Sequence, residues 1–298
     1  MIICPDCSQP LKIIDHLICD TCSWEGTKLN KIKNFLSTED RKDPTILSYT
    51  ENYDIIAEDD LHSSIQSPRY IQLQAENLAK LINVNPNSSV CDIGIGQGYL
   101  LKEVLKKGVK NITAIDIAAA YLKKFEDDSR IDLVLANAEN LPFENQFDVI
   151  TTTDVLEHVL NVGSFLYSVN RALKMDGMLY LRVPYRENLI HYSPFFGCKY
   201  KFVHLRTFNK ETLRDYLHAG GFEVIKLRLD GFWYTDPQSF WTKNEKREER
   251  FKKSMKKLMK NLKNVEEVNK WPNWFAKLLM RPFEIGVVAK KVKNLKQI

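Results

Sequence analysis

The fold of this chain is decided by the stretch VCDIGIGQG at residues 90–98. Its first four residues form a short apolar strand, and the pattern predicts that a helix begins near Tyr99. Glycines between a strand and a helix let the backbone turn tightly and approach a ligand, while the helix N-terminus favours negative charge. The stretch therefore predicts a binding site for a nucleotide-like cofactor.

The spacing of this loop separates two cofactor classes. The glycines Gly94, Gly96 and Gly98 follow a Gly-x-Gly-x-Gly pattern, whereas dinucleotide enzymes use Gly-x-Gly-x-x-Gly. Asp92 lies two residues ahead, where a carboxylate repels a pyrophosphate but accepts hydrogen bonds from the amino group of a methionine-type cofactor. The pattern thus favours S-adenosylmethionine (SAM) over NAD. Asp116, at the end of the next strand, suits the two ribose hydroxyls.

Apolar runs and amphipathic stretches alternate from Pro68 onward, which is typical of a parallel sheet flanked by helices. Helical stretches are expected at 99–107, 118–125, 165–173 and 210–219. The sequence predicts an α/β, Rossmann-like fold. The expected strands are 90–93, 112–115, 133–135, 147–151, 178–183, 222–229 and 285–289.

The chain of 298 residues, 44% hydrophobic and 27% charged, is long enough for one large domain with an appendage. We expect a small module at 1–36, a linker at 37–67 and a catalytic domain at 68–298. The start has no basic segment followed by an apolar run, and no apolar stretch reaches about 18 residues. These features predict a cytoplasmic protein.

The net charge of +5 is concentrated late in the chain, because residues 243–270 hold 11 Lys and Arg against 5 Glu. They belong to an expected helical insertion at about 232–282, placed before the last strand. Its apolar positions recur at helical spacing, with Lys and Arg opposite. Three interpretations stay open: a cap packed on the sheet, a helix lying on a membrane surface, or an RNA-binding face.

Four cysteines form two Cys-x2-Cys pairs, Cys4 with Cys7 and Cys19 with Cys22. Four thiolates at this spacing predict a closed, tetrahedral zinc site whose metal stabilises a small ribbon. Two roles stay open for the ribbon, a stabilising or docking element and a direct contact with a substrate such as RNA.

The order of motifs from residue 90 to residue 183 resembles the class I SAM-dependent methyltransferases. Asp92 and the three loop glycines match that family's first motif, and Asp116, followed by Ile117, matches the second. The resemblance implies a seven-stranded sheet with an antiparallel last strand. It also places an adenine-side loop at 137–143, with Asn137 and Ala138 at the cofactor. The family often has an acidic residue at the position of Asn137.

A further segment, Asp154-Val155-Leu156-Glu157-His158, is similar to the subgroup acting on small molecules, including the ubiquinone-pathway O-methyltransferases. That resemblance implies a divalent metal at Asp154, Glu157 and His158, with Asp154 also near the cofactor. Two alternatives stay open from the residues themselves. His158 could be the base that takes the proton of an acceptor hydroxyl, or Asp154 could cap a helix while Glu157 and His158 are structural.

These observations predict a SAM-dependent methyltransferase that O-methylates a small or lipid-linked molecule, such as a sugar or a quinone-like ring. The alternative is an RNA base methyltransferase that contacts RNA through the zinc module and the basic insertion. The fourth motif, however, has no Asn-Pro-Pro-Tyr sequence for exocyclic amines. We also consider a peripheral membrane contact through the insertion.

Overall fold

The computed structural model describes residues 1–12, 17–66, 68–231 and 282–296, together with the pairs 246–247, 249–250 and 253–254. Most of the insertion expected at 232–282, with its three alternative roles, lies outside the described residues. None of the helices in the described part of the chain is long and apolar enough to cross a membrane.

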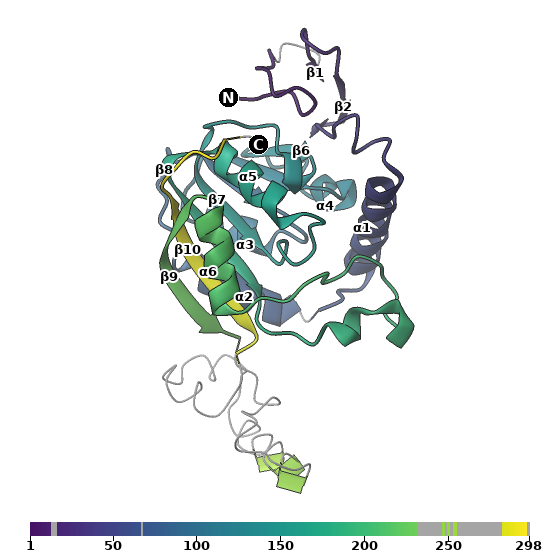
Figure 1. Ribbon diagram of the computed structural model, residues 1–298, viewed down its shortest axis with the longest axis vertical. Coiled ribbons are helices and arrows are strands. Elements are labelled where there is room, and N and C mark those ends of the chain that lie inside the picture. Colours follow the sequence, from purple (N-terminus) through teal and green to yellow (C-terminus); the bar gives the residue numbers. More distant parts are fainter. Residues whose placement is uncertain are drawn as a thin grey trace.

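One mixed sheet organises the described chain, with its strands in the order β1-β2-β3-β6-β5-β4-β7-β8-β10-β9 (Figure 1). Strands β6, β5, β4, β7 and β8 run parallel to one another, while β10 runs antiparallel to both β8 and β9. This arrangement confirms the predicted sheet and its antiparallel last strand. Seven of its ten strands correspond to those that the sequence predicted. Their bounds are β4 Val90–Ile93, β5 Ile112–Asp116, β6 Ile131–Leu135, β7 Phe147–Thr153, β8 Leu173–Pro184, β9 Phe222–Asp230 and β10 Glu284–Lys291.

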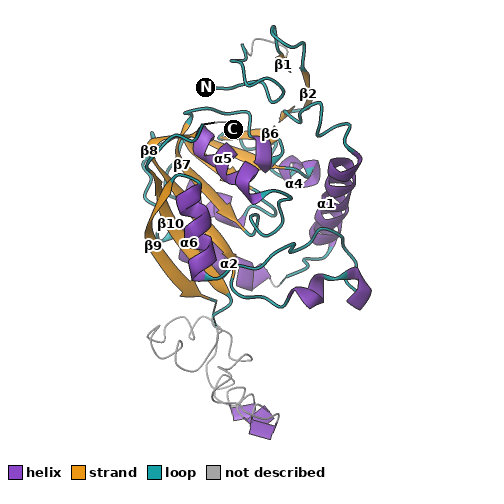
Figure 2. Ribbon diagram, viewed as in Figure 1, coloured by secondary structure: helices purple, strands orange, loops and turns teal. Residues whose placement is uncertain are grey.

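Helices cover both faces of the sheet, as expected for strands that are apolar on both sides (Figure 2). Helices α2 (Pro68–Ala79), α3 (Tyr99–Leu105) and α4 (Ala119–Lys123) share one apolar core with the sheet. Helices α5 (Val162–Ala172) and α6 (Lys210–Ala219) share the other. The short 3₁₀ helices are η1 (Ala138–Asn140), η2 (Leu189–Tyr192) and η3 (Pro194–Phe196).

The N-terminal ribbon continues the sheet. Its strands are β1 (Leu17–Ile18), β2 (Glu25–Leu29) and β3 (Ile32–Asn34), and β3 pairs in parallel with the edge of β6. The indole of Trp24 stacks on Phe35, with ring centroids 5.8 Å apart, and both side chains are buried. The ribbon therefore shares a core with the larger domain.

The segment 37–67, expected as a linker, contains the long helix α1 (Pro44–His62). Asp43 is the N-cap of this helix, because its side chain accepts hydrogen bonds from the backbone N–H groups of Thr45 and Ile46. Proline at the first helical position fits this start. The sequence analysis expected a linker here and did not predict this 19-residue helix.

Candidate active site

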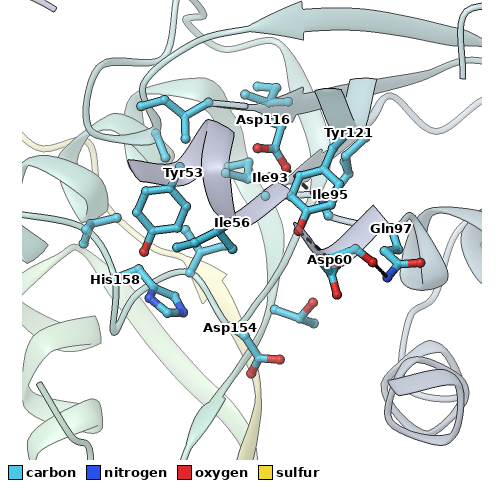
Figure 3. A pocket seen from close by; sticks show the side chains of 18 of the residues that line it. Tyr53, Ile56, Asp60, Ile93, Ile95, Gln97, Asp116, Tyr121, Asp154 and His158 are labelled. Carbon is cyan, nitrogen blue, oxygen red and sulfur yellow. Dashed lines mark hydrogen bonds between the residues drawn. The ribbon is translucent and has the colours of Figure 1, made fainter. Parts of the chain in front are cut away.

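A cavity of about 350 Å³ opens at the carboxyl ends of the parallel strands, where ligands bind in this class of fold (Figure 3). One part is lined by the glycine loop, the ends of β4 and β5, and the start of η1. The other part is lined by aromatic and titratable side chains from α1 and the loops after β7 and β8. The residues lining it include the predicted cofactor positions Asp92, Gly94, Gly96, Asp116, Ile117, Asn137, Ala138 and Asp154.

The glycine loop is built so that only glycine fits. Gly94, Gly96 and Gly98 have φ values of 69°, 48° and 78°, in the left-handed region that other residues rarely adopt. A Cβ at Gly94 would collide with Val155, and one at Gly98 would collide with the ring of Phe125. A Cβ at Gly96 would instead meet no atom within 4 Å, because it would project into open space. This open approach to the backbone fits a cofactor lying against the loop.

Two buried carboxylates flank the loop. One oxygen of Asp116 accepts from the N–H of Gly96 at 3.0 Å, and the other accepts from the N–H of Ala118 at 2.9 Å. Asp92 accepts a hydrogen bond of 2.6 Å from the hydroxyl of Thr151. Burial raises the pKa of Asp116 to about 6 and that of Asp92 to about 7. Both groups therefore become easier to ionise when a ligand donates hydrogen bonds to them.

The adenine-side loop is held from both sides of Asn137. Its side-chain oxygen accepts from the N–H of Glu139 at 3.0 Å and so begins η1. Its nitrogen donates to Asp40 at 2.8 Å. Both ends of the amide are therefore engaged, and the orientation of the side chain is fixed at the cavity wall.

Asp154 has a left-handed backbone, with φ of 53°, and its side chain forms an ion pair with Arg182 of β8. Arg182 is itself buried, and its guanidinium lies 3.8 Å from the carboxylate of Glu284. The residues after Asp154 form turns, so the structure shows no helix there for it to cap. Asp154 thus lines the cavity as part of an ion-pair network.

His158 and His204 line the opposite side of the cavity, and with the buried Glu157 they form a group of three titratable side chains. One ligand atom from each lies within 4.8 Å of the others. Asp154, which the resemblance implies as a metal ligand, forms an ion pair with Arg182 and is not part of this group of three, whereas His204 is.

Glu157 is the most unusual member of this group. It is fully buried, and neither carboxylate oxygen has a hydrogen-bond partner among the described residues. Burial, followed by the nearby charge of Asp154, raises its pKa well above the ordinary range. Burial thus favours the neutral form of this carboxyl, and a further positive charge next to it would favour the ionised form.

The two histidines differ in their environments. Burial lowers the pKa of His158 to about 3, and its Nδ1 accepts a hydrogen bond of 3.3 Å from the backbone N–H of His204. The Nδ1 of His204 instead lies 2.5 Å from the carboxylate of Glu187, and its ring stacks on Tyr192 at 3.9 Å. A carboxylate at Nδ1 holds the proton there and leaves the lone pair of Nε2 available.

Helix α1 forms a wall of the cavity that the sequence did not predict. The Tyr53 hydroxyl donates to the carbonyl of Phe202 at 3.1 Å, and its ring contacts that of His158 edge to face at 5.8 Å (Figure 3). Asn52 exchanges two hydrogen bonds, of 2.6 and 2.9 Å, with the backbone of Lys201. These bonds fasten α1 to the loop after η3, so both segments enclose the part of the cavity that His158 lines.

The four predicted cysteines meet at one point of the ribbon. The sulfurs of Cys4 and Cys22 are 3.6 Å apart, those of Cys7 and Cys19 are 3.5 Å apart, and all four lie within 4.8 Å of one another. Four thiolates on a tetrahedral zinc would be about 3.8 Å apart, given a Zn–S bond of about 2.3 Å. The donor set and its spacing therefore fit zinc.

Residues 64–227, more than half of the chain, match a family described as a methyltransferase domain. The chain belongs to this methyltransferase family. The methyltransferase is 31% identical over 118 residues to a ubiquinone biosynthesis O-methyltransferase of Pseudomonas aeruginosa, covering 37% of this chain and 50% of that protein. It spans about half the length of the curated relatives with this description.

Two further similarities extend this comparison. A tRNA U34 carboxymethyltransferase of Pseudoalteromonas atlantica is 32% identical over 101 residues, covering 32% of this chain and 31% of that one. The fold is similar to that of Burkholderia thailandensis 1,6-didemethyltoxoflavin-N1-methyltransferase, solved with its substrate and S-adenosylhomocysteine. The TM-score is 0.53 at 15% identity, and the match covers 84% of this chain and 91% of that chain. At this identity the likeness concerns the fold of the methyltransferase.

Proposed function

We propose that this protein transfers a methyl group from SAM to a hydroxyl of a small molecule, a quinone-like or lipid-linked aromatic ring. The observation that carries the proposal is that one cavity holds both halves of the required site. The cofactor half consists of the glycine loop with Asp92 and Asp116, and the acceptor half is lined by His158 and His204, with Glu157 buried next to them. The similarity to ubiquinone-pathway O-methyltransferases supports a hydroxyl acceptor.

In this proposal Asp116 accepts hydrogen bonds from the ribose hydroxyls and Asp92 accepts from the cofactor's amino group. The backbone of Gly96 lies against the cofactor, because the space beside its Cα is open. These contacts hold the sulfonium methyl toward the acceptor half. Methyl transfer is an in-line displacement, so positioning of the two reactants supplies much of the catalysis.

We further propose that Glu157, His158 and His204 hold a divalent cation. A buried carboxylate without a hydrogen-bond donor fits a site that is completed by a positive ion. His204 fits as a ligand through Nε2, because Glu187 orients its ring from the other side. When bound, such a cation lowers the pKa of a coordinated hydroxyl and so favours loss of its proton.

The aromatic walls of the acceptor half favour a flat ring as the substrate. Tyr53 stands beside His158, and Tyr192 stacks on His204 with an interplanar angle of 6°. Planar faces of this kind pack well against an aromatic ring. A sugar has no such face, so we place a quinol-like or catechol-like acceptor ahead of a sugar.

The experiment that tests the function is methyl transfer from radiolabelled SAM to a panel of catechols, quinols, sugars and total tRNA. Transfer to a ring hydroxyl supports the proposal, and label found only in tRNA would establish the alternative RNA function instead. Calorimetric titration with S-adenosylhomocysteine tests the cofactor separately. Absence of binding in the wild-type protein would refute the proposed function altogether.

The cation is tested with Glu157→Gln. Glutamine resembles the neutral form of the buried carboxyl, so the variant is expected to fold and to bind S-adenosylhomocysteine like the wild type. It is also expected to lose binding of Mg²⁺ or Mn²⁺ by calorimetry, together with methyl transfer. Glu223→Gln, on the exposed side of β9, is the matched control. Equal cation affinity in Glu157→Gln and wild type would refute the site.

We also propose one zinc ion at Cys4, Cys7, Cys19 and Cys22, with a structural role. All four positions are taken by thiolates, so no coordination position remains for a substrate. Elemental analysis of protein purified without chelator should give one zinc per chain. Cys22→Ser, at the exposed ligand, should lower that content, whereas Cys198→Ser should leave it unchanged.

A further inference from the structure

The zinc ribbon contacts the adenine-side loop directly. Asn140 donates through its side-chain nitrogen to the carbonyl of Pro5 at 2.7 Å, and Pro5 follows the cysteine ligand Cys4. The N–H of Ile3 donates to the carbonyl of Pro142 at 3.0 Å. Residues on both sides of Cys4 thus hold the loop that forms the cofactor half of the cavity.

Asp40, which follows the ribbon, makes the contact closest to the cavity. Its side chain is buried, and one oxygen accepts from the side-chain nitrogen of Asn137. The other oxygen accepts from both the N–H and the hydroxyl of Ser37, at 2.9 and 2.7 Å. Asp40 is therefore fixed by its own turn and fixes Asn137 in its place.

The carboxylate of Asp40 can influence a bound cofactor through Asn137. Asn137 lines the cavity, and the carboxylate of Asp40 lies behind it and accepts from its side-chain nitrogen. The oxygen of Asn137 is already used by the N–H of Glu139. The bonds to Asp40 and to Glu139 therefore fix the side chain that Asn137 presents to the cavity.

We propose that Asp40 is a positioning residue for the cofactor, and that the zinc ribbon, through Asp40 and Pro5, sets the affinity of the adenine-side loop for SAM. The proposal rests on the proposed function, since it presumes that SAM occupies the cavity. It goes beyond the proposed function because the N-terminal ribbon then helps to hold the cofactor, in addition to its structural role.

The ribbon is rigidly enough joined to the sheet for such coupling. The N–H of Phe35 donates to the carbonyl of Leu135 at 2.8 Å, directly before the adenine-side loop. The ligands Cys4 and Cys19 are buried in the same apolar core as Leu141 of that loop. Loss of the metal would free the backbone around Cys4 and loosen the contacts that Ile3 and Pro5 make.

The test is a double-mutant cycle on S-adenosylhomocysteine affinity, measured by calorimetry. Asp40→Asn leaves one acceptor oxygen for the two donors of Ser37 and the amide of Asn137, so we expect binding to weaken about tenfold. Asn137→Asp places two carboxylates against each other and should weaken binding as well. In the double variant the donor and acceptor are exchanged, and we expect affinity to return to within about twofold of wild type.

Glu39→Gln is the matched control, because Glu39 is the exposed acid next to Asp40 and its loss changes the charge equally. It should leave affinity unchanged. Additive effects in the double variant, or wild-type affinity in Asp40→Asn, would overturn the role of Asp40. Wild-type protein that binds no S-adenosylhomocysteine would refute the proposed function instead, so the two failures are distinguishable.

The second experiment tests the role of zinc in the full-length protein. Zinc is removed with a chelator, and S-adenosylhomocysteine affinity is measured before removal, after removal and after zinc is restored. We expect a loss of at least about tenfold that zinc reverses, with a smaller loss in the Asp40→Asn background. Equal affinity with and without zinc would overturn the coupling.

Discussion

Asp92→Asn should make the protein more stable and a weaker binder of SAM at the same time. The pKa of Asp92 is raised by burial from 3.8 to about 7 in the folded protein, although the hydroxyl of Thr151 donates to it. The folded state therefore binds this proton more tightly than the unfolded state. Stability from this group is complete below about pH 4 and is lost as the pH rises through about 7.

The magnitude follows from the shift. About three pKa units, at about 1.4 kcal/mol each, give an upper limit of about 4 kcal/mol. Water entering the open cavity reduces this value, and we expect at least about 1 kcal/mol to remain. Asparagine cannot ionise, so the variant escapes the penalty at high pH. Its free energy of unfolding should exceed that of wild type by more at pH 8 than at pH 5.

The assay is urea unfolding of both proteins, without cofactor, at pH 5 and pH 8. Comparing the two pH values cancels what asparagine contributes independently of charge. Calorimetry at pH 8 should show weaker S-adenosylhomocysteine binding, by about 1.5–3 kcal/mol, because a charge-assisted hydrogen bond is lost. Asp127→Asn, at an exposed acid, is the control. The same stability difference at both pH values would refute the reasoning.

Three other predictions concern the cavity and its surroundings. Asp116→Ala should weaken S-adenosylhomocysteine binding by at least about 1.5 kcal/mol, measured by calorimetry, with Asp116→Asn in between; unchanged affinity would exclude the ribose contact. Gly98→Ala should lower the free energy of unfolding by at least about 1 kcal/mol, because φ is positive and Phe125 leaves no space, whereas Gly96→Ala should mainly weaken binding. Joining Gly231 to Phe283 by a short turn should keep S-adenosylhomocysteine binding, since the N–H of Phe283 already bonds to Asp230. Lost methyl transfer in that deletion would support an insertion that covers the substrate, and full transfer would exclude it.

The sheet was predictable because each strand is a short apolar run between turn signals. The strand expected at 90–93 has those bounds, and the others differ mainly at their ends, as for β8, which begins five residues earlier than expected. The glycine loop and the two acids after β4 and β5 were predictable for a further reason. Their backbone and charge requirements are local, so they appear in consecutive residues.

The acceptor half was less predictable, because it is assembled from distant segments. Nothing in the sequence around Tyr53 indicates that α1 reaches His158, about a hundred residues later, and the same holds for the pairing of His204 with Glu187. The role of Asp154 was set by Arg182, a residue on another strand. Contacts of this kind depend on tertiary packing, which local patterns do not encode.

The pairing of β3 with β6 also has a consequence for solubility. Without the ribbon, β6 would be an outer strand of the parallel sheet, with a row of unpaired N–H and C=O groups facing solvent. Such a strand is a template on which a second chain can assemble. The ribbon occupies it with only the short strand β3, and the salt bridge from Lys33 to Asp132 lies across the junction. A shortened chain that begins after residue 36 should therefore self-associate through β6, whatever its affinity for the cofactor.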